Sequence, residues 1–285
     1  MSPWLETSGL TVVPDAGVAS MSLMDAIVLG IVQGVTEFLP VSSSGHLLLA
    51  RHFMGLPAEA MLFDAVVHFG SLLAIVAVFR HELVDMLHGL RFSRDERARG
   101  GRRLLMLLGL ATLPLVAVGL LARHWVKEVF SNPVVVPVML FVTAGLLVLS
   151  ERFHTTGRGE ITVRRAVLIG LAQVLAVLPG LSRSGTTIAG GMLLGLDRER
   201  ATRFSFLLAI PAILGVTVLE LRHALTGGAP AVASPASLVV GTAASAIATF
   251  VAVVLFLRFV RGRRLTPFAV YCAGVGGVLL LVQPW

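Results

Sequence analysis

Long uninterrupted runs of apolar residues dominate the chain, with little of the apolar–polar alternation that marks a half-buried strand. The hydrocarbon core of a bilayer is about 30 Å thick, and an α-helix crosses it with roughly 20 residues. Six runs meet this length and predict six transmembrane helices, at about 62–80, 103–122, 133–152, 203–222, 236–258 and 266–284. The pattern is typical of an all-α integral membrane protein.

Two further apolar stretches are interrupted near their middle and do not fit a single crossing helix. Residues 23–55 are broken by Leu39–His46, and residues 163–196 are broken by Leu178–Thr187. Both interruptions contain proline, serine and glycine, which end helices or favour caps and turns. We expect two re-entrant hairpins, each a half-helix that enters the membrane, turns at a polar tip and returns. Such a turn requires protein or a wet cavity around it.

Composition excludes the common alternatives. Of 285 residues, 56% are hydrophobic and 14% are charged, whereas a soluble domain has about a quarter of its residues charged. The formal net charge of +7 comes from short basic clusters between apolar runs, without a basic face interleaved with aromatic residues, so no nucleic-acid partner is expected. Cys272 is the only cysteine, which excludes an intrachain disulfide and a cysteine-based metal site.

The basic residues also predict how the chain crosses the membrane. The segments 80–103, 151–165, 197–203 and 258–264, which are expected to be loops, hold 18 of the 23 Lys and Arg residues. They all face the cytoplasm if both interrupted stretches are hairpins, whereas a full crossing by one of them would mix the charges. The positive-inside rule therefore favours six spans plus two hairpins.

The two hairpins resemble each other in sequence at an offset near 140 residues. Gly30–Gln33 aligns with Gly170–Gln173, and Ser44-Gly45 aligns with Ser184-Gly185. Each half of the chain then consists of one hairpin followed by three spans. Because three is odd, the second half enters from the opposite face of the membrane, and a ligand site is expected near the midplane where the broken helices meet.

This repeat defines the domain organisation. We predict a first repeat over residues 21–155 and a second, inverted repeat over residues 156–285. Residues 1–20 contain Glu6 and Asp15 but neither Lys nor Arg, so they do not match a secretory signal peptide. They are interpreted as an N-terminal extension or an expression remnant.

Polar side chains at the first tip are candidates for chemistry. Glu37 follows Gln33 by one helical turn, and a carboxylate in an apolar arm is costly unless it is paired, protonated or bound to a cation. It is a candidate general base or metal ligand, the alternative being a buried acid that bonds between helices. Ser42–Ser44 either cap the returning half-helix or supply a nucleophile or oxyanion donor. His46 is a second candidate base or an ordinary polar residue at a helix start.

The second tip carries Arg183, whose guanidinium cannot lose its proton and matches phosphate oxygens in geometry. It opens a half-helix whose first amides also face an anion. An ion pair with Glu37 is the structural alternative, and the two roles are compatible. Asp64 and His68, four residues apart on a span, are interpreted as an inter-helix hydrogen-bond pair rather than a site.

A carboxylate, several hydroxyls and a fixed cation inside an apolar bundle suit an anionic headgroup attached to a lipid tail. Transfer of a phosphoryl group needs mostly positioning and charge neutralisation, often with a divalent metal. The competing function is a transporter or flippase that carries a phosphorylated lipid or anion through the same midplane site.

The motifs resemble those of one known family. Gln33–His46 resembles the (Glu/Gln)-x-x-x-Glu and Pro-Val-Ser-Ser-(Thr/Ser)-Gly-His signature of the undecaprenyl-pyrophosphate phosphatases, also called bacitracin-resistance proteins. Pro179–Thr187 resembles their Pro-Gly-x-Ser-Arg-Ser-Gly-x-Thr signature. The resemblance extends from about residue 21 over nearly the whole chain, in motif order and spacing.

The resemblance implies a multi-pass enzyme of the bacterial inner membrane whose active site opens toward the periplasm. It would remove one phosphate from undecaprenyl pyrophosphate with Mg²⁺ or Ca²⁺, recycle the lipid carrier for peptidoglycan synthesis and confer bacitracin resistance. By matching position, Glu37 is the essential acid and a metal ligand, and Ser43 is the nucleophile or phosphate contact. His46 is a supporting acid or base, and Arg183 is the phosphate clamp.

The remaining polar residues of the motifs are expected to bind substrate: Gln33, Ser42, Ser44, Ser182, Ser184, Thr186 and Thr187. Gln33 stands where some members have Glu, which leaves the metal-ligand set open. Also open are a phosphoserine intermediate against direct attack by water, the preferred prenyl length, and the oligomeric state, for which a homodimer is one option.

Overall fold

The computed structural model describes residues 21–57, 60–91, 95–121, 134–153, 159–226 and 233–282. Within these ranges all regular elements are helices, as the sequence predicts, apart from an isolated bridge between Met21 and Ala233. The interpretation of residues 1–20 as an extension lies outside the described residues.

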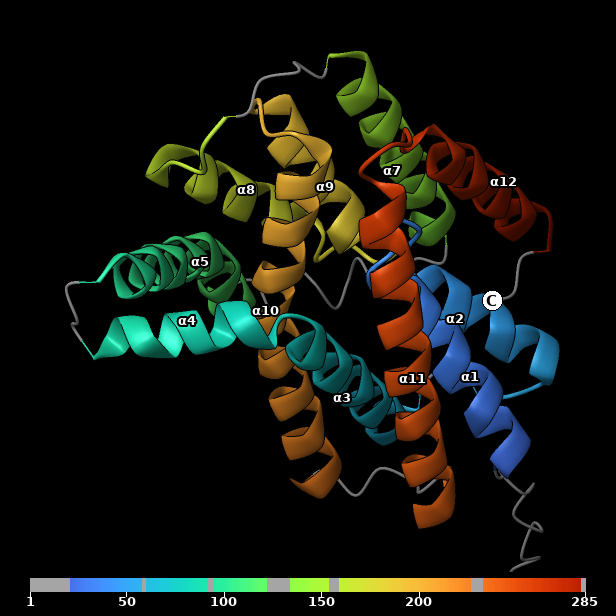
Figure 1. Ribbon diagram of the computed structural model, residues 1–285. Helices are drawn as coiled ribbons and strands as arrows, with labels where there is room; N and C mark the ends of the chain where they lie inside the picture. The colour runs from blue at the N-terminus through green and yellow to red at the C-terminus, as the bar shows by residue number, and fades with distance from the viewer. Residues whose placement is uncertain are drawn as a thin grey trace, which may run out of the picture.

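Each of the six predicted spans coincides with a helix in the structure. These helices are α3 (Met61–Val78), α5 (Glu96–Leu121), α7 (Val135–Arg152), α10 (Arg198–Thr226), α11 (Pro235–Phe259) and α12 (Thr266–Val282), shown in Figure 1. Helices α5, α7, α10 and α11 are each long and apolar enough to cross a membrane. α3 reaches that length only together with the helix after it, and α12 is a shorter apolar helix of 17 residues. The chain is therefore a multi-pass membrane protein.

The segment expected to form the first basic loop instead contains a helix, α4 (Arg80–Leu90), which follows α3 after a bend of 77°. α4 packs along the start of α5 (Figure 1), with Met86 buried in the contact. A Cβ atom on Gly101 would lie 1.9 Å from the carbonyl oxygen of Asp85, so glycine is needed for this close approach. The prediction of a loop was wrong here because α4 is amphipathic and gains a packed face.

Four short helices form the two interrupted stretches, with breaks that overlap the predicted ones but begin and end a few residues earlier. α1 (Leu23–Thr36) and α2 (Ser43–Met54) have 14 and 12 residues. α8 (Val163–Leu175) and α9 (Arg183–Leu193) have 13 and 11 residues. At 1.5 Å per residue these helices are about 16 to 21 Å long, so none of them alone crosses a hydrocarbon core of about 30 Å.

The two stretches begin in different surroundings. α1 starts beside the first turn of α11, where the hydroxyl of Ser237 donates to the backbone oxygen of Met21 over 3.3 Å. α8 starts beside the charged end of α5, where Arg103 donates to Glu160 over 3.1 Å and to the backbone oxygen of Ile161 over 3.3 Å.

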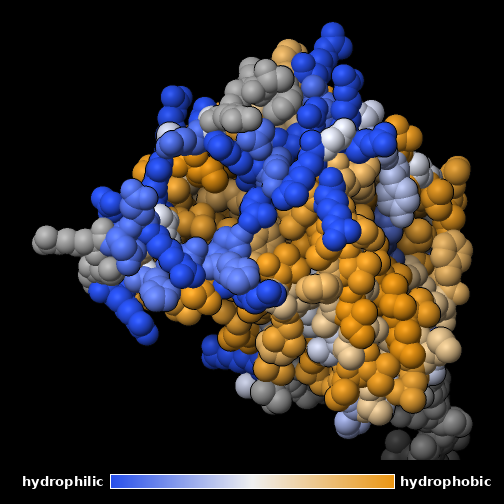
Figure 2. All heavy atoms as spheres, in the orientation of Figure 1, coloured by the Kyte–Doolittle hydropathy of each residue, from blue (hydrophilic) through white to orange (hydrophobic). Residues whose placement is uncertain are grey.

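Ion pairs connect the basic segments that are predicted to share one side of the membrane. They are Arg103–Glu160, Arg198–Glu151, Arg203–Glu82 and Arg261–Glu199. Figure 2 shows the hydrophilic side chains gathered toward the top and left of the molecule, whereas the lower right of this face is almost entirely hydrophobic. This separation is what a protein with a large lipid-facing surface requires.

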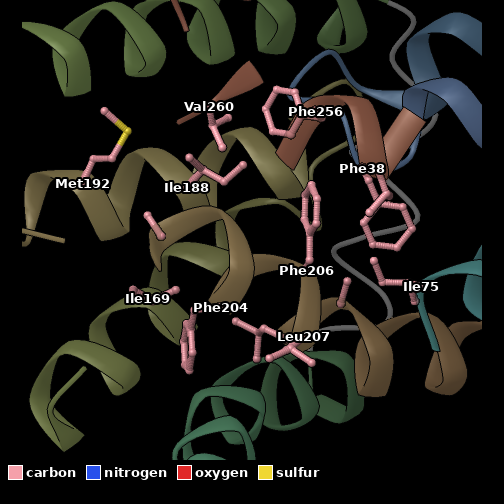
Figure 3. Close-up of a cluster of buried hydrophobic side chains, with 14 of the residues drawn as sticks. Phe38, Ile75, Ile169, Ile188, Met192, Phe204, Phe206, Leu207, Phe256 and Val260 are labelled. Carbon is pink, nitrogen blue, oxygen red and sulfur yellow. The ribbon is translucent and has the colours of Figure 1, made fainter. Parts of the chain in front are cut away.

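A cluster of phenylalanines holds the first tip in the core (Figure 3). The fully buried ring of Phe38 makes an edge contact with Phe206 at a centroid distance of 5.1 Å, and Phe206 lies 5.9 Å from Phe256. Gly34 allows the end of α1 to touch α11, since a Cβ there would lie 2.4 Å from the carbonyl oxygen of Ser245. The residue between these two anchors, Glu37, is thereby held in a defined place.

Candidate active site at the junction of the two hairpins

The polar tips of the two hairpins contact each other inside the helix bundle. The amide of Gly180 donates to the hydroxyl of Ser44 over 3.2 Å, and the hydroxyl of Ser184 donates to the backbone oxygen of Leu39 over 2.8 Å. Gly180 has a φ of +87°, and a Cβ on it would lie 2.3 Å from the backbone oxygen of Val136. Glycine at this position thus permits both the turn and its close packing on α7.

Glu37 is the central acceptor of the junction. It immediately follows α1 and is 8% exposed. Its Oε2 accepts hydrogen bonds from Gln33 Nε2 at 2.8 Å and from Ser43 Oγ at 2.7 Å. Its Oε1 accepts from the guanidinium of Arg183, which completes an ion pair between the hairpins. A buried carboxylate is costly without such partners, and here each carboxylate oxygen has at least one.

Arg183 is the first residue of α9, a helix that is capped by the side chain of Ser182 accepting from the amide of Gly185. The guanidinium carbon of Arg183 lies 5.7 Å from the centroid of the Phe38 ring, in addition to its ion pair with Glu37. The ion pair with Glu37 that the sequence leaves open as an alternative is therefore present. The side chain keeps 16% of its surface exposed, toward a cavity that it shares with Glu37.

The three serines of the first tip differ in their contacts. Ser42 occupies the N-cap position of α2, yet its side chain makes no capping hydrogen bond and instead contacts the hydroxyl of Ser44 at 3.2 Å. Its φ of +70° is rare for any residue with a side chain. Such strain persists only where the surroundings enforce it, and it is enriched at functional sites. Ser43, the next residue, directs its hydroxyl at Glu37.

His46 lies apart from the cavity, although the sequence predicts it as an acid or base. Its Nδ1 donates to the backbone oxygen of Ser42 over 2.8 Å. Its Nε2 forms a 2.8 Å hydrogen bond with the hydroxyl of Tyr271, and the two rings stack with centroids 5.4 Å apart. In this structure the contacts of His46 hold the strained backbone of Ser42 in place.

Several predicted substrate-binding residues have other partners. Thr186 donates to the backbone oxygen of Ser182 within α9, and Thr187 donates to the backbone oxygen of Arg183 and shares a 2.6 Å hydrogen bond with Ser205. Gln33 is fully buried and donates to Glu37. Ser42, Ser44 and Ser182 are the members of the set that line the cavity, together with Ser43, which is predicted as the nucleophile.

The cavity has a volume of about 380 Å³ and is lined by both polar and apolar side chains. The polar side chains include Glu37, Arg183 and serines of both tips. The apolar side chains come from Leu115 of α5, Val177 of the second tip, and Ala212, Ile213 and Val216 of α10. The volume lies within the usual range for small-molecule sites, about 300 to 1,000 Å³. An amphipathic ligand is the kind that such a mixed lining suits.

Three polar residues of this cavity did not emerge from the sequence as site residues. His68 of α3 has its Nε2 3.6 Å from Glu37 Oε2, and Asp64 forms an ion pair with Arg51 of α2. Asp64 thus pairs with a neighbouring helix as expected, whereas His68 contacts Glu37 and lines the cavity. Glu220 of α10 and Gln173 of α8 also line the cavity. In the sequence, Glu220 is recognisable as a carboxylate inside an apolar span, and Gln173 as the residue that aligns with Gln33.

Metal binding by side chains alone finds little support at this junction. Among the residues that the structure describes, no group of three or more His, Cys, Asp or Glu residues is arranged to hold a metal ion. Mg²⁺ is commonly bound by one or two carboxylates together with substrate phosphates, and Glu37 fits such a role.

Comparison with known proteins identifies the family of this chain. The profile of "Bacitracin resistance protein BacA" matches residues 26–278. Undecaprenyl-diphosphatase 1 of Shouchella clausii is 37% identical, over 92% of this chain and 97% of the relative. Undecaprenyl-diphosphatases of Syntrophotalea carbinolica and Desulfosudis oleivorans are 39% and 41% identical, over 92% of this chain and 100% and 99% of their own lengths. The family expected from the two motifs is confirmed, and the chain belongs to the bacitracin resistance protein BacA family.

Proposed function

We propose that this chain is an undecaprenyl-diphosphatase, which hydrolyses undecaprenyl pyrophosphate to undecaprenyl phosphate and inorganic phosphate. The observation that carries the proposal is the contact of Glu37 with both Ser43 and Arg183, which joins a base, a hydroxyl and a cation from two hairpins. Relatives of nearly equal length that bear this enzyme name support it. Through this activity the chain confers bacitracin resistance and returns the lipid carrier to peptidoglycan synthesis.

The mixed lining of the cavity matches the two parts of the substrate. The pyrophosphate, an anion, is attracted by Arg183 and by the hydroxyls of the tips. The prenyl tail leaves along apolar side chains of α5 and α10, such as Leu115 and Val216. An amphipathic cavity of this kind favours a lipid pyrophosphate over a small hydrophilic anion.

The resting ion pair defines the first step of the mechanism. Arg183 exchanges its contact with Glu37 for oxygens of the terminal phosphate, which lowers the negative charge around phosphorus. Glu37 is then free to accept the proton of Ser43, whose hydroxyl already points at Oε2 at 2.7 Å. Neutralisation of the phosphate charge and activation of the base are thereby coupled, because Arg183 leaves Glu37 as the substrate binds.

The chemical step is a displacement at the terminal phosphorus. The Oγ–P bond to Ser43 forms, the anhydride P–O bond breaks, and undecaprenyl phosphate departs with the bridging oxygen, to which Glu37 returns the proton that it took from Ser43. The ionised Glu37 then deprotonates a water molecule, which attacks the phosphoserine. The Oγ–P bond breaks, Ser43 regains a proton from Glu37, and inorganic phosphate is released. Direct attack by a water in the place of Ser43 gives the same products, and trapping of phosphate on Ser43 distinguishes the two routes.

A divalent cation, Mg²⁺ or Ca²⁺, would be held by Glu37 together with phosphate oxygens of the substrate and would supply further charge neutralisation. Gln33 contributes by orienting Glu37 through its amide, whatever the full set of ligands. His46 acts as a positioning residue through the backbone of Ser42.

The membrane arrangement that we propose has six crossing helices and two re-entrant hairpins in two inverted repeats, residues 21–155 and 156–285. It is supported by the short lengths of α1, α2, α8 and α9 and by the different surroundings in which α1 and α8 begin. With the ion-paired basic segments in the cytoplasm, the first hairpin enters from the periplasmic side of the inner membrane. The active site then opens toward that side.

The enzyme is distinguished from a transporter by phosphate release without a sealed membrane. Purified protein in detergent, given undecaprenyl pyrophosphate and Mg²⁺, is expected to release inorganic phosphate. Arg183→Ala is expected to abolish most of this release. Arg103→Ala, which removes a paired arginine at the charged end, serves as the matched control and retains it. Movement of a phosphorylated lipid across vesicles without phosphate release in detergent would contradict the proposal.

A further inference from the structure

Gln173 occupies the place in the second hairpin that Gln33 occupies in the first. Gln33 donates to Glu37, four residues further along the same helix face. Four residues beyond Gln173 is Val177, which offers no acceptor in its side chain. The second hairpin therefore has the glutamine amide, Gln173, but lacks a carboxylate in the place of Glu37, to which Gln33 donates in the first hairpin.

The amide of Gln173 is left without a partner in a buried position. The residue is 1% exposed, and within the described part of the chain neither its Nε2 nor its Oε1 has a hydrogen-bond partner. The Gln33 amide, by contrast, leaves only Oε1 unpartnered. Buried polar groups are nearly always paired in folded proteins, and exceptions call for a bound water, an ion or a ligand.

The position of Gln173 identifies what its partner would be. It lies on α8, and it lines the same cavity as Glu37, Ser43 and Arg183. α8 is held close to α5, since a Cβ on Gly170 would lie 2.2 Å from the backbone oxygen of Ala111, so Gln173 is set on a fixed helix. A carboxamide offers two N–H donors and a carbonyl acceptor without a net charge.

The geometry points to Gln173 as a further substrate-binding residue, whose Nε2 donates to a non-bridging oxygen of the bound pyrophosphate and whose Oε1 accepts from a water in the same cavity. This inference rests on the proposed function. Phosphate oxygens accept but do not donate, so the amide nitrogen is the end that recognises them. A glutamate in the same place would retain the shape and repel the substrate.

Two variants test this role in purified protein. Gln173→Leu removes both polar ends, and it is expected to raise KM for undecaprenyl pyrophosphate about 10- to 100-fold, with kcat changed less than about threefold. Gln173→Glu keeps the size and is expected to raise KM further because of its negative charge. The thermal midpoint of ligand-free Gln173→Leu should equal or exceed that of the wild type, since two unpaired buried groups have gone.

The matched control is Thr202→Val. Thr202 is also fully buried, and within the described residues its hydroxyl has no hydrogen-bond partner, but it does not line the cavity. The KM of the Thr202→Val enzyme for undecaprenyl pyrophosphate is expected to stay at the wild-type value. A wild-type KM in both Gln173 variants, or a lowered thermal midpoint with an equal loss of kcat in both, would overturn this role. Failure of the wild type itself to release phosphate would instead overturn the proposed function.

Discussion

The two hairpins share a sequence pattern but differ in how their turns are built. In the first, Ser42 adopts a φ of +70° and its side chain caps nothing, whereas in the second the positive φ falls on Gly180 and Ser182 caps α9 in the ordinary way. The first turn directs the hydroxyl of Ser43 at Glu37. The second turn presents the cation Arg183 from an unstrained helix start.

This difference suggests a division of labour between the repeats. In the mechanism that we propose, the first hairpin carries the groups that exchange protons, next to a strained backbone that Phe38 and His46 hold in place. The second hairpin carries the groups that bind an anion without changing protonation. In the proposed inverted repeat, a duplicated scaffold thus supplies both parts of one site.

The largest effect is expected from Ser43→Ala, which removes the hydroxyl that the first hairpin aims at Glu37. If Ser43 is the nucleophile, phosphate release should fall by about 10⁴-fold or more, because a nucleophile acts as a unit with its base. The control is Ser150→Ala, which removes a buried hydroxyl that bonds within its own helix α7. A Ser43→Ala protein with the wild-type rate would assign the attack to water.

Arg183→Ala tests the second hairpin as the source of anion binding. We expect kcat/KM to fall by about 10³-fold, since a positioned arginine on a transferred phosphoryl group contributes roughly this much. Arg183→Lys should recover only part of the loss, because an ammonium lacks the planar fork of donors. Equal activity of the lysine variant and the wild type would show that charge alone is needed.

Glu37→Gln removes the base and preserves its shape. Phosphate release is expected to fall by about 10²- to 10³-fold, in the range of general acid–base contributions. Glu160→Gln, which changes a paired carboxylate at the charged end, is the matched control and should retain activity. A folded Glu37→Gln protein with full activity would remove the acid from the mechanism and erase the chemical contrast between the hairpins.

The smallest effects concern the backbone of the two turns. Ser42→Gly should raise the free energy of unfolding by about 1 kcal/mol, because glycine adopts a positive φ without strain. It should lower kcat a few-fold, because the hydroxyl of Ser43 is then held less firmly toward Glu37. Gly180→Ala should have the opposite effect on stability, since its Cβ would meet the backbone of Val136. Equilibrium unfolding in mixed micelles measures both, and equal signs would contradict the contrast between the turns.

Much of this arrangement could be predicted from local rules. Pro40 and Pro179 lie in apolar runs that cannot continue as helices, so the breaks fall within a few residues of the predicted positions. The inverted pattern of the two hairpins predicts that their polar tips meet, and it leaves open whether Arg183 pairs with Glu37 or binds a phosphate. The ion pair of Arg183 with Glu37 is present, and the roles of both residues in catalysis remain predictions.

The remaining features depend on how helices rotate against distant neighbours. His68 faces Glu37 because α3 packs on α11, where a Cβ on Gly70 would lie 2.4 Å from the backbone oxygen of Thr242. His46 turns to Tyr271, a residue far away in the sequence. Local sequence patterns do not indicate such contacts. The sequence therefore could not distinguish a site role of His68 from a structural one, nor predict Tyr271 as the partner of His46.

The most direct test of the whole account is an experimental structure with a non-hydrolysable pyrophosphate analogue bound. The account predicts the analogue at the junction of the two hairpins, with Arg183 turned from Glu37 to a phosphonate oxygen and Ser43 within hydrogen-bond distance of the terminal phosphorus group. The charged end of the molecule offers an alternative, a cavity lined by Arg103, Arg200 and Arg203. An analogue bound only there, with the pair of Glu37 and Arg183 undisturbed, would contradict the central claim.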